Sequence, residues 1–245
     1  MKTLIYYFYV HKTGWNPLYN LHFFFLSRYR ERFDSQNFIL AIDEDTPKEN
    51  VERVKKAILE IFPSAQITYY PNDPELRESN YFYNEIASNL TQLPDQWYFF
   101  AHNKGVDTWY ASPELCRGWI SGMYFMNLNY MDEIEKQLSY PEMCVIGTFL
   151  IRNVKAWKWL RYNWHFSGTF WWFNPRHIYK VMIKHNTSIP ENSRYFTEGV
   201  WGTTIPDNER YRQPALGMYE ANWRYCFQWM TPKMRLDLEN LSHQN

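Results

Sequence analysis

Short apolar runs alternate with helical patterns through the first hundred residues. Runs rich in aromatic and β-branched residues predict buried strands at 3–10, 37–42, 66–70 and 97–101. Apolar positions at helical spacing predict helices at about 18–33 and 75–90, and a third between the capping box Thr46-Pro47-Lys48-Glu49 and Pro63. This alternation predicts an α/β fold, a Rossmann-like, mostly parallel sheet flanked by helices in a single domain.

The second half of the chain is less regular. Ser112-Pro113-Glu114 resembles a helix start, and the segment to about Gln137 has an apolar helical stripe. Residues 143–149 form another apolar run, which predicts a strand. The run 165–173 reads as one strand with a bulge at its glycine.

Length, charge and cysteine content narrow the functional classes. The 245 residues suit one large domain, and Lys plus Arg equals Asp plus Glu at 26 each, so no net field attracts nucleic acid. Three scattered cysteines have no metal-ligand spacing. The amino-terminal apolar run lacks a cleavage site, and no run is long enough to span a bilayer. We therefore expect a cytoplasmic protein without a nucleic-acid partner.

The fourth predicted strand ends in a polar cluster, His102-Asn103-Lys104-Gly105. Ligands of open parallel sheets bind beyond the carboxyl ends of the strands, so this loop is placed to meet a polar group. A cation beside a glycine suits a phosphate. The alternative is that His102 and Asn103 only bind the backbone of a turn.

Two further segments carry candidate chemistry. Ser167-Gly168-Thr169 precedes Trp171 and Trp172, and a small-residue turn beside flat rings suits a sugar, although the indoles could equally be core. Glu198 stands among aromatic residues, where a raised pKa would suit a general base. Alternatively, it is a surface residue paired with Arg194.

The order of these pieces resembles the nucleotide-sugar glycosyltransferases of the Rossmann-like A-type fold, particularly bacterial enzymes of capsule and lipopolysaccharide biosynthesis. The resemblance covers residues 3–201 and implies that Asp43, after the second strand, binds the nucleoside. It also matches Asn72 and the run Arg77-Glu78-Ser79-Asn80 to donor-binding positions. A His-x-Lys-Gly element followed by Phe-Trp-Trp looks like a subgroup found in polysaccharide biosynthesis.

The chain departs from this family at the fourth strand. Most members carry Asp-x-Asp there and bind a divalent metal on the diphosphate, whereas this sequence has His102-Asn103-Lys104. A lysine can replace the charge of the metal, so we expect metal-independent transfer, with Lys104 and His102 or Arg77 on the diphosphate. Mn²⁺ or Mg²⁺ at Asp43-Glu44-Asp45 is the alternative, although its place ahead of a helix favours nucleoside contact and capping.

The resemblance implies a mechanism and partners. Glu198 would deprotonate an acceptor hydroxyl for inverting displacement, with Trp15 stacking on the nucleoside. Asn103 is also expected to bind the donor. The acceptor, a saccharide or lipid-linked saccharide, would be bound by Ser167, Gly168, Trp171 and Trp172. Residues 1–110 would hold the nucleotide, 111–213 the acceptor, and the aromatic, basic tail 214–245 packs on the fold or touches a membrane surface.

Two other functions compete with glycosyl transfer. A non-catalytic carbohydrate-binding relative would also lack Asp-x-Asp. Nucleotidyl transfer to a sugar phosphate uses a similar sheet, but it usually has a glycine-rich basic loop after the first strand, and His11 to Pro17 contains one glycine.

Overall fold

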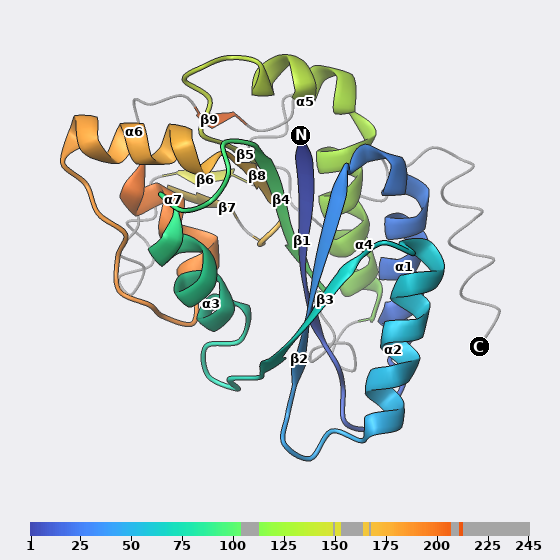
Figure 1. Ribbon diagram of the computed structural model, residues 1–245. Helices are drawn as coiled ribbons and strands as arrows, with labels where there is room; N and C mark the ends of the chain where they lie inside the picture. Colours follow the sequence, from blue (N-terminus) through green and yellow to red (C-terminus); the bar gives the residue numbers. More distant parts are fainter. Residues whose placement is uncertain (104–112, 149, 153–163, 167, 207–210, 213–245) are drawn as a thin grey trace.

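A seven-stranded sheet with the order β3-β2-β1-β4-β8-β5-β9 forms the centre of the molecule (Figure 1). The computed structural model describes residues 1–103, 113–148, 150–152, 164–166, 168–206 and 211–212. The strands of this sheet are β1 (Lys2–Tyr9), β2 (Ser35–Ile42), β3 (Gln66–Pro71), β4 (Trp97–His102), β5 (Val145–Gly147), β8 (Trp171–Phe173) and β9 (Tyr211–Arg212). Strand β8 runs antiparallel to β4 and β5, and the other pairings are parallel. The predicted mostly parallel α/β fold is confirmed.

Helices cover both faces of the sheet (Figure 1). One face carries α1 (Pro17–Tyr29), α2 (Lys48–Ile61) and α4 (Pro113–Tyr124), with α5 (Met131–Leu138) beside them. The other face carries α3 (Glu78–Tyr81), α6 (Pro175–His185), α7 (Phe196–Thr204) and a ribbon of β6 (Leu150–Arg152) and β7 (Trp164–Phe166). Alternate residues of β1 pack into the two hydrophobic cores on opposite faces of the sheet. Leu4, Tyr6 and Phe8 belong to one core, and Ile5 and Tyr7 belong to the other.

Two helix predictions need correction. The capping box is wrong, because Pro47 is the N-cap of α2 and makes no side-chain cap; the Thr46 hydroxyl instead accepts from the Asp43 N–H at 3.1 Å. The single helix predicted over 75–90 is three short pieces: α3, a π-helical turn at Phe82–Ile86 and a 3-10 turn at Ala87–Asn89. The wide π turn places Phe82 in the core, against the rings of Phe100 and Trp171.

The run 165–173 is also not one strand. Its two ends belong to different sheets, β7 to the small ribbon and β8 to the main sheet. Gly168 lies between them with φ 125°, a conformation that favours glycine. A Cβ there would lie 2.6 Å from the sulfur of Met123, so the turn also requires the missing side chain.

The described helices are all too short or too polar to cross a bilayer. The thiols of Cys116 and Cys144 are buried and form no disulfide. Lys104, Ser167, Cys226 and the tail 214–245 lie outside the described residues, as do parts of both predicted halves. The division into a nucleotide half and an acceptor half stays a prediction.

Candidate functional site

The carboxyl ends of β1 and β4 border the point where the strand order reverses, because β2 and β3 extend the sheet on one side of β1 and β4 lies on the other. Asn103, directly after β4, forms hydrogen bonds with the backbone of β1 at this point. Its N–H donates to the Tyr7 carbonyl at 3.2 Å, its Oδ1 accepts from the Tyr9 N–H at 2.9 Å, and its Nδ2 donates to the Tyr9 carbonyl at 2.8 Å. The side-chain amide of Asn103 thus binds the backbone at the end of β1, and its predicted contact with the donor stays a prediction.

Asp43 is the centre of a hydrogen-bond network across the ends of three strands. Its Oδ2 accepts from the Tyr9 hydroxyl at 2.7 Å, and its Oδ1 accepts from Nδ2 of Asn72 at 2.7 Å. The Tyr7 hydroxyl donates to Oδ1 of Asn72 at 3.2 Å. Two residues predicted from the family resemblance, Asp43 and Asn72, are therefore in direct contact, and two tyrosines of β1 hold them.

Tyr7 connects this network to the next part of the site. Burial raises the pKa of its hydroxyl, and the negative charges of Glu78 and Asp43 raise the pKa further. The hydroxyl therefore stays protonated and remains a hydrogen-bond donor at every physiological pH. The charges of Glu78 on α3 and of Asp43 after β2 thus both act on the Tyr7 hydroxyl.

His102 and Glu78 form a nearly buried pair at the end of β4. His102 Nδ1 lies 3.8 Å from Oε2 of Glu78, and the two side chains are 9% and 13% exposed. At that distance the pair interacts by charge when the imidazole is protonated. A protonated imidazole would present positive charge at the strand ends, where the sequence predicts a phosphate.

Glu198 lies in the first turn of α7. Ser79 ties that turn to α3, because its Oγ donates to the Arg194 carbonyl at 3.1 Å and lies 3.2 Å from the hydroxyl of Thr197. Glu78 and Glu198 are the chain neighbours of Ser79 and Thr197, so they belong to two helices that contact each other, and the base role of Glu198 stays a prediction.

The charge of Glu198 influences the pKa of His165 on β7. Burial lowers the pKa of the imidazole, and the carboxylate partly opposes that effect. Among the described residues, Nδ1 of His165 has no hydrogen-bond partner, although the side chain is 7% exposed. His165 is therefore a buried imidazole whose protonation is influenced by Glu198.

Arg77 and Asn80 are close to Glu78 in the sequence. Arg77 has φ 54° and ψ −132°, a conformation that favours glycine and strains other residues, and its N–H donates to the Asp73 carbonyl at 2.7 Å. Asn80 accepts from Nδ2 of Asn84 at 2.9 Å. Their donor-binding roles stay predictions.

Trp15 is only partly available for stacking on a nucleoside. Its Nε1 donates to Asn20 at 2.9 Å, and the guanidinium of Arg53 lies 4.5 Å from its ring centroid. The ring of Phe23 is nearly parallel to it at 5.7 Å. Trp15 therefore contacts residues of α1 and α2. To stack on a nucleoside as predicted, its ring would need Arg53 or Phe23 to move away from it.

The predicted acceptor platform is wrong for Trp171 and Trp172. Both indoles are 0% exposed. Strand β8 lies between β4 and β5, so its side chains enter the two opposite cores: Trp171 stacks on Phe100 at 5.2 Å, and Trp172 donates to the Asn127 carbonyl at 3.2 Å. The alternative, that these rings are core, is confirmed; Gly168 lies in a tight buried turn.

No three His, Cys, Asp or Glu side chains gather as a metal site within the part of the chain that the structure describes. In the acidic cluster after β2, Asp45 forms an exposed ion pair with Lys12 at 2.9 Å, which lowers the pKa of its carboxyl. Asp43 instead binds Tyr9 and Asn72, so the two carboxylates have separate partners.

Four members of the site escaped sequence reasoning: Tyr7, Tyr9, Glu78 and His165. Tyr7 and Tyr9 occupy the end of the first strand, and Glu78 lies inside the run that matched the family. A search for polar atoms at strand ends could have found the tyrosines. His165 has no local signal, because its relation to Glu198 depends on how α7 packs on β7.

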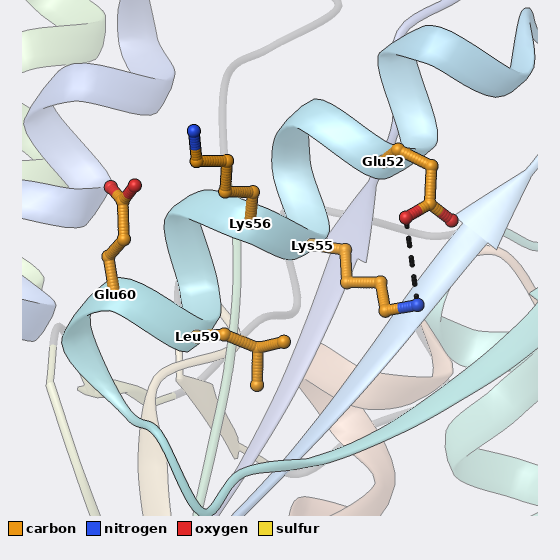
Figure 2. Close-up of a pocket in the computed structure, with 5 residues that line it drawn as sticks. All are labelled: Glu52, Lys55, Lys56, Leu59 and Glu60. Carbon is orange, nitrogen blue, oxygen red and sulfur yellow. Dashed lines mark ion pairs between the residues drawn. The ribbon is translucent and has the colours of Figure 1, made fainter.

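A shallow hollow of about 330 Å³ lies elsewhere, on the outer side of α2 (Figure 2). It is lined by Glu52, Lys55, Lys56, Leu59 and Glu60. All five residues belong to one helix, and Lys55 Nζ lies 3.6 Å from Glu52 Oε2. The hollow includes no residue from the strand ends, so we assign it no role in the site.

Comparisons with known proteins give no family. No family model matches the chain, and no curated protein matches it. The chain is similar in structure to a 4-diphosphocytidyl-2C-methyl-D-erythritol synthase, with 10% sequence identity, 98% of each chain covered and a TM-score of 0.44. The residues of the site, rather than a relative, therefore carry the functional proposal.

Proposed function

We propose that this protein transfers a sugar from a nucleoside diphosphate donor to a saccharide or lipid-linked saccharide acceptor in bacterial surface polysaccharide biosynthesis. The network of Tyr9, Asp43, Asn72 and Tyr7 carries the proposal. It holds one carboxylate at the strand ends, next to the position where the strand order reverses and where ligands of such sheets bind.

Asp43 is prepared to bind the nucleoside. A carboxylate has about four acceptor positions, and Tyr9 and Asn72 each use one, on different oxygens. The remaining positions can accept from ribose hydroxyls or a base amine. Because the two existing bonds fix the carboxylate, little side-chain entropy is lost when a ligand binds.

The diphosphate would bind beside β4. His102, whose positive charge Glu78 would stabilise at 3.8 Å, and Arg77 would supply cationic groups there, and Lys104 follows His102 by two residues in the sequence. Such cations would stabilise the negative charge that develops on the departing nucleoside diphosphate. Transfer would then proceed without a divalent metal.

Glu198 would act as the general base. It removes the proton from an acceptor hydroxyl, the oxygen forms a bond to the anomeric carbon, and the bond from that carbon to the phosphate oxygen breaks with its electron pair leaving on the diphosphate. Attack from the opposite side inverts the configuration. His165, with its buried Nδ1, would orient the acceptor hydroxyl next to Glu198.

The test is release of nucleoside diphosphate from a panel of nucleotide sugars in EDTA, with saccharide acceptors and products identified by mass spectrometry. Glu198→Gln should abolish transfer and leave donor binding intact, since the amide cannot accept the proton. Glu191→Gln, on the exposed loop before α7, is the matched control. Full turnover of the Glu198 variant would overturn the base assignment, and release of pyrophosphate would indicate nucleotidyl transfer instead.

A carbohydrate-binding module without catalysis is the competing proposal. Such a module needs an open aromatic wall, and burial of Trp171 and Trp172 removes the wall that the sequence suggested. Saccharide binding without any nucleotide binding would favour it over transfer.

A further inference from the structure

The outer side of α6 combines positive charge with exposed apolar side chains. The helix, PRHIYKVMIKH, contains one arginine, two lysines and no acidic residue. Arg176, Lys180 and Lys184 recur every four residues and form one exposed stripe, and Tyr179 and Ile183 follow the same spacing beside it. Ile183 is 65% exposed and Tyr179 is 39% exposed. We call these five residues the basic face of α6.

The helix is fixed in this orientation. Ile178 and Val181 on its inner side are buried in the core. The side chain of Asn174 caps its amino end by accepting from the His177 N–H at 3.0 Å, and Asn186 ends it in a left-handed conformation. Exposure of the basic face is therefore a property of the packed fold rather than of a loose helix.

Other exposed apolar residues lie near the start of α6. The Met1 carbonyl accepts from the Trp97 N–H at 3.2 Å, and the ring of Trp97 packs edge-on against His177 of α6 at 5.8 Å. His177 Nδ1 lies 2.6 Å from the carbonyl of Met143, whose N–H donates to the Tyr140 carbonyl. Met1 is 71% exposed and Tyr140 is 38% exposed. Two exposed apolar side chains thus belong to segments that are connected to the start of α6 through Trp97 and Met143.

We propose that the basic face of α6 docks on the surface of an anionic lipid bilayer. Cations beside exposed aliphatic and aromatic side chains on one helix face match the headgroup and acyl layers of such a surface. The charge pattern is local, because the whole chain has equal numbers of acidic and basic residues. A purely polar polyanion would gain nothing from Ile183, whereas the interfacial layer of a bilayer buries it.

Docking leaves the candidate site open. Strand β8 pairs antiparallel with β4, with Phe173 opposite Tyr98 near the beginning of β4. Helix α6 therefore begins at the edge of the sheet opposite the carboxyl ends of β1 and β4. Membrane binding should consequently be independent of nucleotide, and its test is separate from that of the proposed function.

The experiment is sedimentation of the full chain with phosphatidylcholine vesicles that do or do not contain phosphatidylglycerol. The wild-type chain should bind only the anionic vesicles. Each surface lysine contributes about fivefold to binding, so Lys180→Glu/Lys184→Glu should reduce it by at least about 25-fold. Tyr179→Ser/Ile183→Ser should abolish the binding that remains at high salt, where charges are screened.

The matched control is Lys48→Glu/Lys56→Glu, which makes the same charge change at exposed positions of α2. It should bind like the wild-type chain. The proposal is overturned if the wild-type chain ignores anionic vesicles, if the α6 charge variant sediments as before, or if the α2 variant loses as much. Sedimentation velocity gives one more result that would contradict the proposal. If the wild-type chain is a dimer that the α6 variants dissociate, and it does not bind vesicles, this face is an interface between two copies.

Discussion

The side-chain amide of Asn72 donates to Oδ1 of Asp43 at 2.7 Å and joins residues that follow two neighbouring strands. The contact forms because β2 and β3 run parallel in register, with Ile42 opposite Pro71, so the residues after each strand emerge side by side. The amide fixes one oxygen of the carboxylate, and the Tyr9 hydroxyl fixes the other. The nucleoside-binding role proposed for Asp43 depends on this fixed geometry.

Replacing Asp43 by asparagine should weaken nucleoside diphosphate binding. The amide has one acceptor oxygen instead of two and no charge, and loss of a hydrogen bond to a charged group corresponds to about ten- to hundredfold in Kd. Asp45→Asn is the control, because that carboxylate forms an exposed ion pair with Lys12. Titration calorimetry measures both variants. If Asp43→Asn binds the nucleoside diphosphate as tightly as the wild-type chain does, Asp43 does not bind the nucleoside.

Arg77 permits a test that separates backbone strain from ligand binding. At φ 54°, Arg77→Gly relieves strain that Arg77→Ala retains, so the glycine variant should be more stable than the alanine variant by about 1 kcal/mol. Both variants lack the guanidinium and should lose affinity for the diphosphate alike. Urea unfolding and donor titration give the two quantities. A donor affinity unchanged in both variants would contradict the diphosphate role.

The free energy of unfolding should fall as the pH decreases below about 6.5, in part because of His165. Burial lowers the pKa of its imidazole below the ordinary value of 6.5. The unfolded chain therefore binds a proton more readily than the folded chain, so the stabilisation is complete above 6.5 and is lost as the pH falls toward the folded pKa. His165→Gln should flatten this decline in urea unfolding between about pH 5 and pH 8, compared with the wild-type chain. An identical slope in the variant and the wild-type chain would show that other groups cause the decline.

Gly202 controls the packing of α7 on β7, and with it the place of Glu198. A Cβ at this position would lie 1.6 Å from the Trp164 carbonyl oxygen, which is backbone and cannot turn away. Gly202→Ala should therefore lower the free energy of unfolding by at least about 2 kcal/mol. Thr203→Ala, one residue later, is the control. A normal unfolding midpoint for Gly202→Ala would mean that α7 packs differently.

The apolar runs located β1, β2 and β4 well because strands buried on both faces are continuous in sequence. Asp43 and Asn72 were accessible to sequence reasoning because they follow β2 and β3 directly. The contribution of Tyr9 depends on register: Tyr9 pairs with Ala41, so its ring extends toward Asp43 two residues beyond. No local pattern encodes that pairing between distant segments.

The acceptor platform failed for a similar reason. The run Phe170 to Phe173 has the same composition whether it faces solvent or lies in a central strand, and only the insertion of β8 between β4 and β5 buries both indoles. His165 and Glu198 are 33 positions apart in the sequence, and the charge of Glu198 influences His165 only because α7 packs on β7. The spacing of apolar residues does not predict this packing. The strand ends were thus predictable, and the pairing across elements was not.

The most direct test of the account is a thermal-shift screen of the wild-type chain and Asp43→Asn against UDP, GDP and CDP, each with EDTA and with Mn²⁺. A ligand that binds only the folded state raises Tm according to its occupancy. One diphosphate should raise the Tm of the wild-type chain in EDTA, and this shift should be lost in the variant. No shift with any nucleotide would contradict nucleotide-dependent transfer, and a shift only with Mn²⁺ would contradict its independence of metal.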